Sequence, residues 1–153
     1  MFITRPLNLP AYPFRLTQVE GKLYIFDKLR KKKLLLSPEE WVRQHFVQFL
    51  INDKKYPPSL IKLEGGVKIN THLNRTDILV YNSFGTPFIL VECKASTVKI
   101  NQKVFDQAAR YNAVHQVTYL VISNGLQHYC CQMDYENHTY KFIQEIPQYI
   151  ADV

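Results

Sequence analysis

Three charged residues interrupt the apolar stretch from Asp77 to Ser96. Asp77 opens this stretch, and Glu92 and Lys94 lie near its end. In a β-strand, residues two apart share a face, so Glu92 and Lys94 are expected to be neighbours. With a four-residue loop at 83–86, antiparallel pairing sets Asp77 opposite Glu92. The pattern therefore predicts two carboxylates and an amine at one place on a hairpin.

Two facing carboxylates need a positive partner, and this need suggests a metal site. Like charges directly opposite each other on paired strands are destabilising, and burial adds a desolvation cost. Mg²⁺ takes one or two carboxylates and keeps several waters, which leaves room for a phosphate substrate. In a second interpretation, Asp77 ends the strand and Glu92 forms a surface ion pair with Lys94 or Arg75. Arg75 is also a candidate phosphate contact.

The elements around the hairpin predict an α/β (α+β) domain. Residues 14–27 alternate on both sides of Glu20 and Gly21, as a hairpin does, after an extended proline-containing segment. Ser37 and Pro38 suit a helix N-terminus. A second helix is expected at 101–116, and strands at 60–70, 117–125, 126–133 and 139–146. We expect one domain over 1–153, with a mixed central sheet flanked by helices, a core at about 37–134, and an extended segment and hairpin at 1–36.

Composition predicts a globular protein, and its positive charge favours a polyanionic partner but would also suit an ordinary soluble protein. The chain has 153 residues, with 19 Lys and Arg against 13 Asp and Glu and a net charge of +6. Its three cysteines show no disulfide or zinc spacing, which predicts reduced thiols. No apolar run approaches the roughly 20 residues of a membrane helix, and no signal-peptide pattern opens the chain. We expect a cytoplasmic protein without a membrane role.

A basic run at residues 28–33 has two interpretations. It carries five cations in six positions, among them Lys31, Lys32 and Lys33. A solvated edge or loop is the simpler explanation. A patch that contacts nucleic-acid phosphates is the functional one.

Five segments of the chain carry a resemblance to known proteins; in order they are LSPEEWVRQHFVQFLI, RTDILVYN, VECKA, FDQAARYN and ISNGLQHY. With them, the chain resembles the type I restriction enzyme R-protein N-terminal domain family and, through it, the PD-(D/E)xK nuclease superfamily. The resemblance implies a restriction-endonuclease-like fold in which Asp77 and Glu92 ligate Mg²⁺ or Mn²⁺. It also implies that Lys94 orients the attacking water or stabilises charge on the phosphate. Phosphodiester hydrolysis needs both an activated nucleophile and an electrostatic clamp.

The resemblance adds an acid from the first helix, and Glu39 and Glu40 are both available. At 100° per residue, Glu39 falls on the inward stripe with Val42 and Phe46, whereas Glu40 lies near its flank. This geometry favours Glu39 as the third catalytic acid. Both glutamates would also stabilise the helix N-terminus through its dipole, without any catalytic role.

Gln107 and Tyr111 are spaced i, i+4 on the second predicted helix, so they share a face. The resemblance gives this pair a role in positioning the site or the nucleic acid. Ordinary helix packing is the alternative for this part of the chain.

These observations favour a metal-dependent deoxyribonuclease domain of the endonuclease type, linked to restriction-modification. The chain contains no phosphate-loop motif. Two alternatives follow: a nuclease that acts alone, or one that works with protein partners that supply recognition or translocation. The alternative from another class is a catalytically inactive nucleic-acid-binding or scaffold module with the same fold. A junction-resolving nuclease, which needs a homodimer to cut two strands, is a third hypothesis. DNA and RNA both stay open as the nucleic acid.

Overall fold

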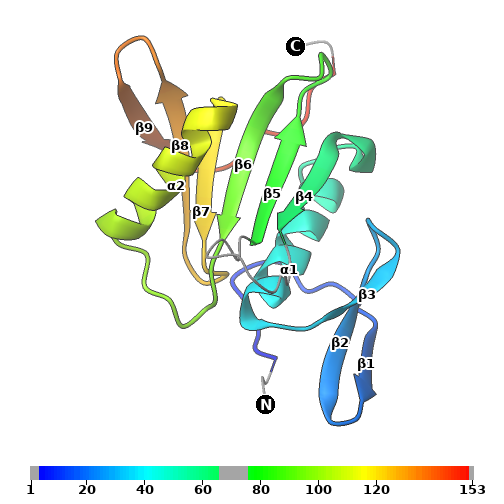
Figure 1. The fold of residues 1–153 in the computed structure, drawn as a ribbon. Coiled ribbons are helices and arrows are strands. Elements are labelled where there is room, and N and C mark those ends of the chain that lie inside the picture. Colours follow the sequence, from blue (N-terminus) through cyan, green and yellow to red (C-terminus); the bar gives the residue numbers. More distant parts are fainter. Residues whose placement is uncertain (1–3, 66–75, 152–153) are drawn as a thin grey trace.

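The computed structural model describes residues 4–65 and 76–151, with the backbone alone described at positions 64, 65 and 76. Two sheets and two α-helices make up this part of the chain (Figure 1). In chain order the elements are β1 (Leu16–Val19), β2 (Lys22–Asp27), β3 (Lys32–Leu35), α1 (Pro38–Asn52), the 3₁₀ turn η1 (Pro58–Leu60), β4 (Ile61–Gly65), β5 (Thr76–Tyr81), β6 (Pro87–Cys93), α2 (Gln102–His115), β7 (Tyr119–Ser123), β8 (His128–Asp134) and β9 (Thr139–Ile143).

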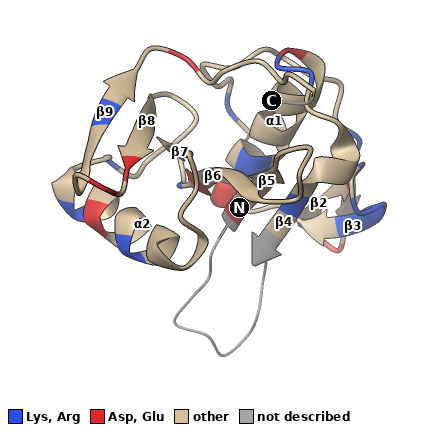
Figure 2. Ribbon diagram, turned by 90° about the horizontal axis from the view of Figure 1, so that it is seen from above, with Lys and Arg blue, Asp and Glu red and all other residues tan. Residues whose placement is uncertain are grey.

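The central sheet has six strands in the order β4-β5-β6-β7-β8-β9. Neighbouring strands are antiparallel except β6 and β7, which are parallel and joined through α2. Helix α1 contacts β5 and β6, and α2 contacts β6 and β7. The two helices lie on opposite faces of the sheet (Figure 2). This arrangement confirms the predicted α/β class with a mixed central sheet flanked by helices.

Side-chain alternation divides the core into two layers. Ile78 and Val91 belong to the cluster around α1, whereas Leu79 and Leu90 belong to the cluster around α2. All four side chains are fully buried, at 0% exposure. A sheet covered on both faces needs apolar residues at successive positions, which is why β5 and β6 look uniformly hydrophobic in sequence.

Both helices begin at residues with short polar side chains. The Ser37 hydroxyl accepts a hydrogen bond from the Glu40 N–H at 3.1 Å, and Pro38 is the first helical residue. The Asn101 side chain accepts from the Val104 N–H at 3.0 Å. Each cap satisfies a backbone donor that has no partner within its helix. The predicted start of the first helix is confirmed.

The N-terminal sheet has three strands rather than the two of the expected hairpin. β1 and β2 form that hairpin, and β3 then pairs with β2, setting Lys32 opposite Asp27. The Asp27 carboxylate accepts from the backbone N–H groups of Leu29 and Arg30, both at 2.9 Å. These bonds close a turn that brings part of the basic run back as a strand. The sequence pattern predicted an edge, loop or phosphate-contacting patch here, but not a third strand.

The register of the β5–β6 hairpin confirms the expected pairing of the acids. Asp77 is opposite Glu92, and the ladder continues in step as far as Val80. Beyond this point the register shifts, so Tyr81 rather than Asn82 is opposite Pro87. The Asn82 side chain accepts from two N–H groups of the loop and holds it closed. The irregularity is therefore confined to the loop end of the hairpin.

An extended N-terminal segment, residues 5–14, crosses α1 before β1 begins. The Trp41 indole N–H donates to the Arg5 carbonyl at 2.8 Å. The Phe14 ring lies 4.6 Å from the His45 ring and 5.6 Å from the Trp41 ring. Asn8 donates from its backbone to the Gly125 carbonyl at 2.7 Å. The segment thereby covers a side of α1 that the sheet leaves open.

Gly125 is a packing contact for this segment, and its replacement by alanine should be costly. Gly125 has φ +85°, and an added Cβ would lie 2.8 Å from Leu7 Cδ2 and 3.1 Å from Val42 Cγ2. Strained backbone costs about 1–2 kcal/mol, and overpacking adds about 1–3 kcal/mol. We expect Gly125→Ala to lower the free energy of unfolding by the sum of both, measured by urea denaturation.

Gly85→Ala is the matched control for this prediction. Gly85 has a similar φ of +81°, but an added Cβ would meet nothing within 4 Å. Its substitution should therefore cost only the backbone strain. Equal losses of stability in the two variants would contradict the packing role of Gly125.

Candidate active site at the end of β5 and β6

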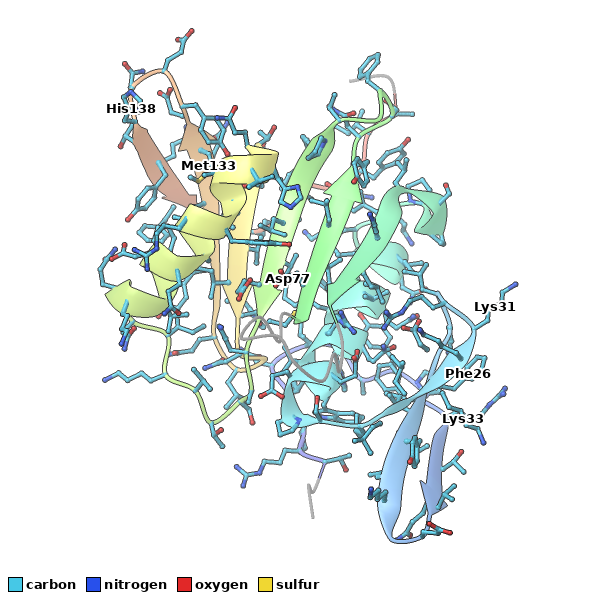
Figure 3. The ribbon with its side chains drawn as sticks, in the orientation of Figure 1. Phe26, Lys31, Lys33, Asp77, Met133 and His138 are labelled. Atoms are coloured by element: carbon cyan, nitrogen blue, oxygen red, sulfur yellow. The ribbon has the colours of Figure 1, made fainter. Side chains whose placement is uncertain are left out.

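Asp77, Glu92 and Lys94 come together where β5 begins and β6 ends. Asp77 is 0% exposed, and its cross-strand partner Glu92 is 5% exposed. The Lys94 ammonium lies 3.3 Å from Glu92 Oε1 and is partly open to solvent, with 29% of the side chain exposed. Figure 3 shows Asp77 at the beginning of β5. The predicted meeting of two carboxylates and an amine is thus present.

The pleat of the strands determines which face of the sheet the side chains of Asp77 and Glu92 share. Directly opposed residues on antiparallel strands have Cβ atoms about 4.5–5.5 Å apart and point to the same side. Asp77 and Glu92 share the face of Leu79 and Leu90, which pack toward α2. Two buried carboxylates at this separation repel each other unless positive charge lies nearby. The Lys94 ammonium supplies such charge beside Glu92.

The chemistry of the donors suits a hard divalent cation. Mg²⁺ is bound through one or two carboxylates and keeps most of its other positions for water and phosphate oxygens. Among the side chains that the structure describes, those of residues 4–63 and 77–151, no group of three or more His, Cys, Asp or Glu is placed to hold a metal. The facing carboxylates of Asp77 and Glu92 fit a site of this kind.

A buried ion pair on α1 contacts the backbone of β5, the strand that carries Asp77. Arg43 is 0% exposed, and its Nε and Nη2 donate to the two Glu40 carboxylate oxygens at 2.9 and 2.6 Å. Gln44 donates to the same carboxylate at 3.0 Å. Arg43 Nη1 also donates to the backbone carbonyl of Asp77 at 3.5 Å. The pair joins the first helix to the strand that carries Asp77.

The burial of the two first-helix glutamates is the reverse of the helical-wheel expectation. Glu40 is 6% exposed, whereas Glu39 is half-buried. The wheel assumed one inward stripe, but the sheet and the N-terminal segment enclose this end of α1 from more than one side. Glu40 is therefore buried on what the wheel treated as a flank. The catalytic role of Glu39 stays a prediction.

Gln107 and Tyr111 lie on α2 as expected but differ in their surroundings. Gln107 is exposed, and Tyr111 is half-buried against the core cluster around α2. The Tyr111 ring makes an edge contact with His115, with ring centroids 5.4 Å apart. The functional role of the pair stays a prediction.

The basic run and the acids occupy separate parts of the protein. Lys31, Lys32 and Lys33 are exposed at the start of β3, and Lys31 and Lys33 point outward from the N-terminal sheet, away from Asp77 (Figure 3). Blue ribbon marks the concentration of positive charge on β3 in Figure 2. Arg75, the other predicted phosphate contact, lies outside the described residues.

Comparison with known families places this site in context. Residues 38–147 match the family model described as type I restriction enzyme R protein N terminus. The chain belongs to this family. No curated protein matches the chain. The matched region runs from α1 past β9 and includes the two acids, Lys94 and the Glu40–Arg43 pair, whereas β1 to β3 precede it.

Sequence patterns of this restriction R-protein N-terminal domain did not indicate Arg43, Gln44 or Asp27. Burial acts to raise the pKa of Asp27, but hydrogen bonds from the Arg30 backbone and side chain and from Gln44 lower that pKa below its usual range. Gln44 thus contacts both Asp27 and Glu40. The sequence offers no signal for these residues, because Arg43 and Gln44 belong to a polar run of three residues between Val42 and Phe46.

No helix in the described part of this restriction-family domain is long and apolar enough to cross a membrane.

The cysteines of the domain are buried thiols rather than nucleophiles. Cys93 is 2% exposed, and Cys130 and Cys131 are 6% and 0% exposed. Burial raises the pKa of Cys93 well above its ordinary value. It also raises the pKa of Cys130 to about 12 and that of Cys131 to about 11. Since the thiolate is the reactive form, these side chains are expected to be inert near neutral pH.

Thiol titration checks this expectation. At pH 8 the native protein should release almost no chromophore from Ellman's reagent over minutes, and three thiols should react after denaturation in guanidinium. Rapid reaction of one thiol in the native protein would contradict the burial of all three.

Proposed function

We propose that this domain is a metal-dependent endonuclease that hydrolyses phosphodiester bonds in DNA. The observation that carries the proposal is the buried Asp77–Glu92 pair with the Lys94 ammonium 3.3 Å from Glu92. The family match adds a restriction-related context, and the resemblance to PD-(D/E)xK nucleases supports the same assignment.

Asp77 and Glu92 are the residues that would hold Mg²⁺ or Mn²⁺. Their buried oxygens are a hard donor pair, and burial strengthens their attraction for a cation because the local dielectric is low. A bound cation supplies Lewis-acid polarisation of the phosphate and lowers the pKa of a bound water. The cost of keeping two carboxylates opposite each other is then offset.

Lys94 is suited to act on the phosphate itself. Its side chain is more open to solvent than either acid, so a DNA phosphate can approach it. In hydrolysis, a water oxygen bonds to phosphorus, the bond from phosphorus to the leaving sugar oxygen breaks, and a proton passes from the water to that oxygen. The ammonium stabilises negative charge that builds on the phosphate during this exchange.

Cleavage of supercoiled plasmid DNA tests the proposal. Purified protein with Mn²⁺ or Mg²⁺ should convert the plasmid to nicked or linear forms, and EDTA should stop the reaction. Single-stranded DNA and RNA of matched sequence measure the nucleic-acid preference. Cleavage that persists in excess EDTA would overturn the metal-dependent assignment.

Lys31, Lys32 and Lys33 are proposed as a phosphate-contacting patch that adds affinity. Removing one lysine–phosphate pair lowers the salt slope of DNA binding by about 0.9. Replacing all three by glutamine should therefore weaken binding at low salt and reduce the slope by up to about 2.7. Fluorescence anisotropy with a labelled duplex in EDTA measures both quantities without cleavage.

A control variant that loses three positive charges outside β3 shows whether the position of the lysines or only the net charge of the protein determines DNA binding. Lys103, Arg110 and Lys141 are exposed on α2 and β9 and can be changed to glutamine together. If this variant loses as much affinity and salt slope as the β3 variant, the assignment of a patch to β3 is wrong.

A further inference from the structure

We propose that Arg43 is a positioning residue that holds Asp77 in place for metal binding, with Glu40 as its anchor. This inference rests on the proposed metal-dependent function and extends it to helix α1, which carries Glu40 and Arg43. It also gives the buried glutamate of α1 a role other than metal ligation.

The contacts of Arg43 run in two directions. Its Nε and Nη2 meet Glu40 in a two-point contact at 2.9 and 2.6 Å, which fixes the plane of the guanidinium. The remaining Nη1 donates to the Asp77 carbonyl at 3.5 Å. A guanidinium held on one side by a carboxylate presents its last donors in a fixed direction. Arg43 therefore acts on the backbone of the proposed ligand itself.

Asp77 occupies a position where such support matters. It is the second residue of β5, next to the end of the strand. Strand ends open more readily than strand centres because fewer hydrogen bonds hold them. A contact to the Asp77 carbonyl from α1 opposes that opening and keeps the carboxylate opposite Glu92.

The anchor of Arg43 extends away from the site through buried polar groups. Gln44 is 2% exposed and links the Glu40 carboxylate to that of Asp27, which is 1% exposed. Asp27 in turn pairs with Arg30 at 2.8 Å. These contacts tie β2 to α1.

Mn²⁺ binding without DNA tests the role of Arg43 independently of cleavage. The double variant Glu40→Gln, Arg43→Met removes both charges of this buried pair together. Groups that orient metal ligands typically contribute about 10–100-fold in affinity. We expect the double variant to bind Mn²⁺ at least about tenfold more weakly than the wild type in titration calorimetry.

A second acid–arginine pair with the same spacing provides the control. Asp27 and Arg30 are also an i, i+3 pair with a buried acid, but they lie at the end of β2 and in the turn that follows it. Asp27→Asn, Arg30→Met should lower thermal stability in EDTA while Mn²⁺ affinity stays at the wild-type value. An equal loss of affinity in both double variants would reduce Arg43 to a general stabilising role and overturn the inference.

Arg43→Lys keeps the test decisive if the double variant does not fold. Lysine retains the charge but lacks the planar set of donors that reaches Glu40 and Asp77 together. Folding checked by circular dichroism should be kept, and Mn²⁺ affinity should still fall. Wild-type affinity in this variant overturns the inference, whereas a wild-type protein that binds no Mn²⁺ overturns the proposed metal site as well.

Discussion

Replacing Asp77 with asparagine should abolish metal-dependent cleavage of plasmid DNA. The substitution preserves size and removes one of two buried carboxylates that face each other across β5 and β6. A metal ion stabilises the transition state of hydrolysis by several kcal/mol, and each 1.36 kcal/mol changes the rate about tenfold. The initial rate of nicking with Mn²⁺ should fall by at least about 10³-fold.

Lys94→Met distinguishes loss of phosphate stabilisation from loss of metal binding in this experiment. Lys94 is proposed to stabilise charge on the phosphate, so its removal should lower the nicking rate by about 10²–10³-fold. Mn²⁺ affinity should persist in this variant and be abolished in Asp77→Asn. Full activity in either variant would place the chemistry elsewhere. Metal binding with no cleavage by the wild type would favour a nucleic-acid-binding module or a domain that requires a partner.

Glu40→Gln should destabilise the protein by about 3–5 kcal/mol. The substitution removes the Glu40 carboxylate, which forms an ion pair with the Arg43 guanidinium, a group that is 0% exposed. Removing one member of a buried ion pair is costly because the remaining charge is held away from water. The free energy of unfolding from urea titration measures the loss.

Glu39→Gln is the natural comparison, since the same chemical change is made one residue away. Glu39 is half-buried, and its substitution should change stability by no more than about 0.5 kcal/mol. If Glu39 is the third catalytic acid, this variant should remain folded while its cleavage rate drops. Wild-type stability in Glu40→Gln would contradict the structural account of the Glu40–Arg43 pair.

The pairing of the acids was predictable because it depends on local rules. Side chains alternate with a period of two along a strand, and the length of the loop sets which residues are opposite each other. Together these rules place Asp77 opposite Glu92, and the irregularity near Pro87 does not disturb that pairing. The family resemblance pointed to the same residues from a separate direction.

The contacts of Arg43 and the third N-terminal strand depend on tertiary structure. A helical wheel sees one inward stripe, whereas α1 is covered by the sheet and by the N-terminal segment, which buries Glu40 and Arg43 on other faces. The turn that forms β3 depends on the buried Asp27 side chain, and a run of cations by itself gives no sign of it. Hydrophobic periodicity does not reveal which polar side chains are buried by segments that are distant in the sequence.

The unit that folds is larger than the unit that the family comparison recognises. The match begins at residue 38, yet the indole of Trp41 and the ring of His45 are covered by residues that precede it, including Arg5 and Phe14. A fragment trimmed to the recognised boundary would expose an aromatic surface and an unsatisfied indole donor to solvent. Any graft of this domain onto another protein must therefore carry the N-terminal segment with it.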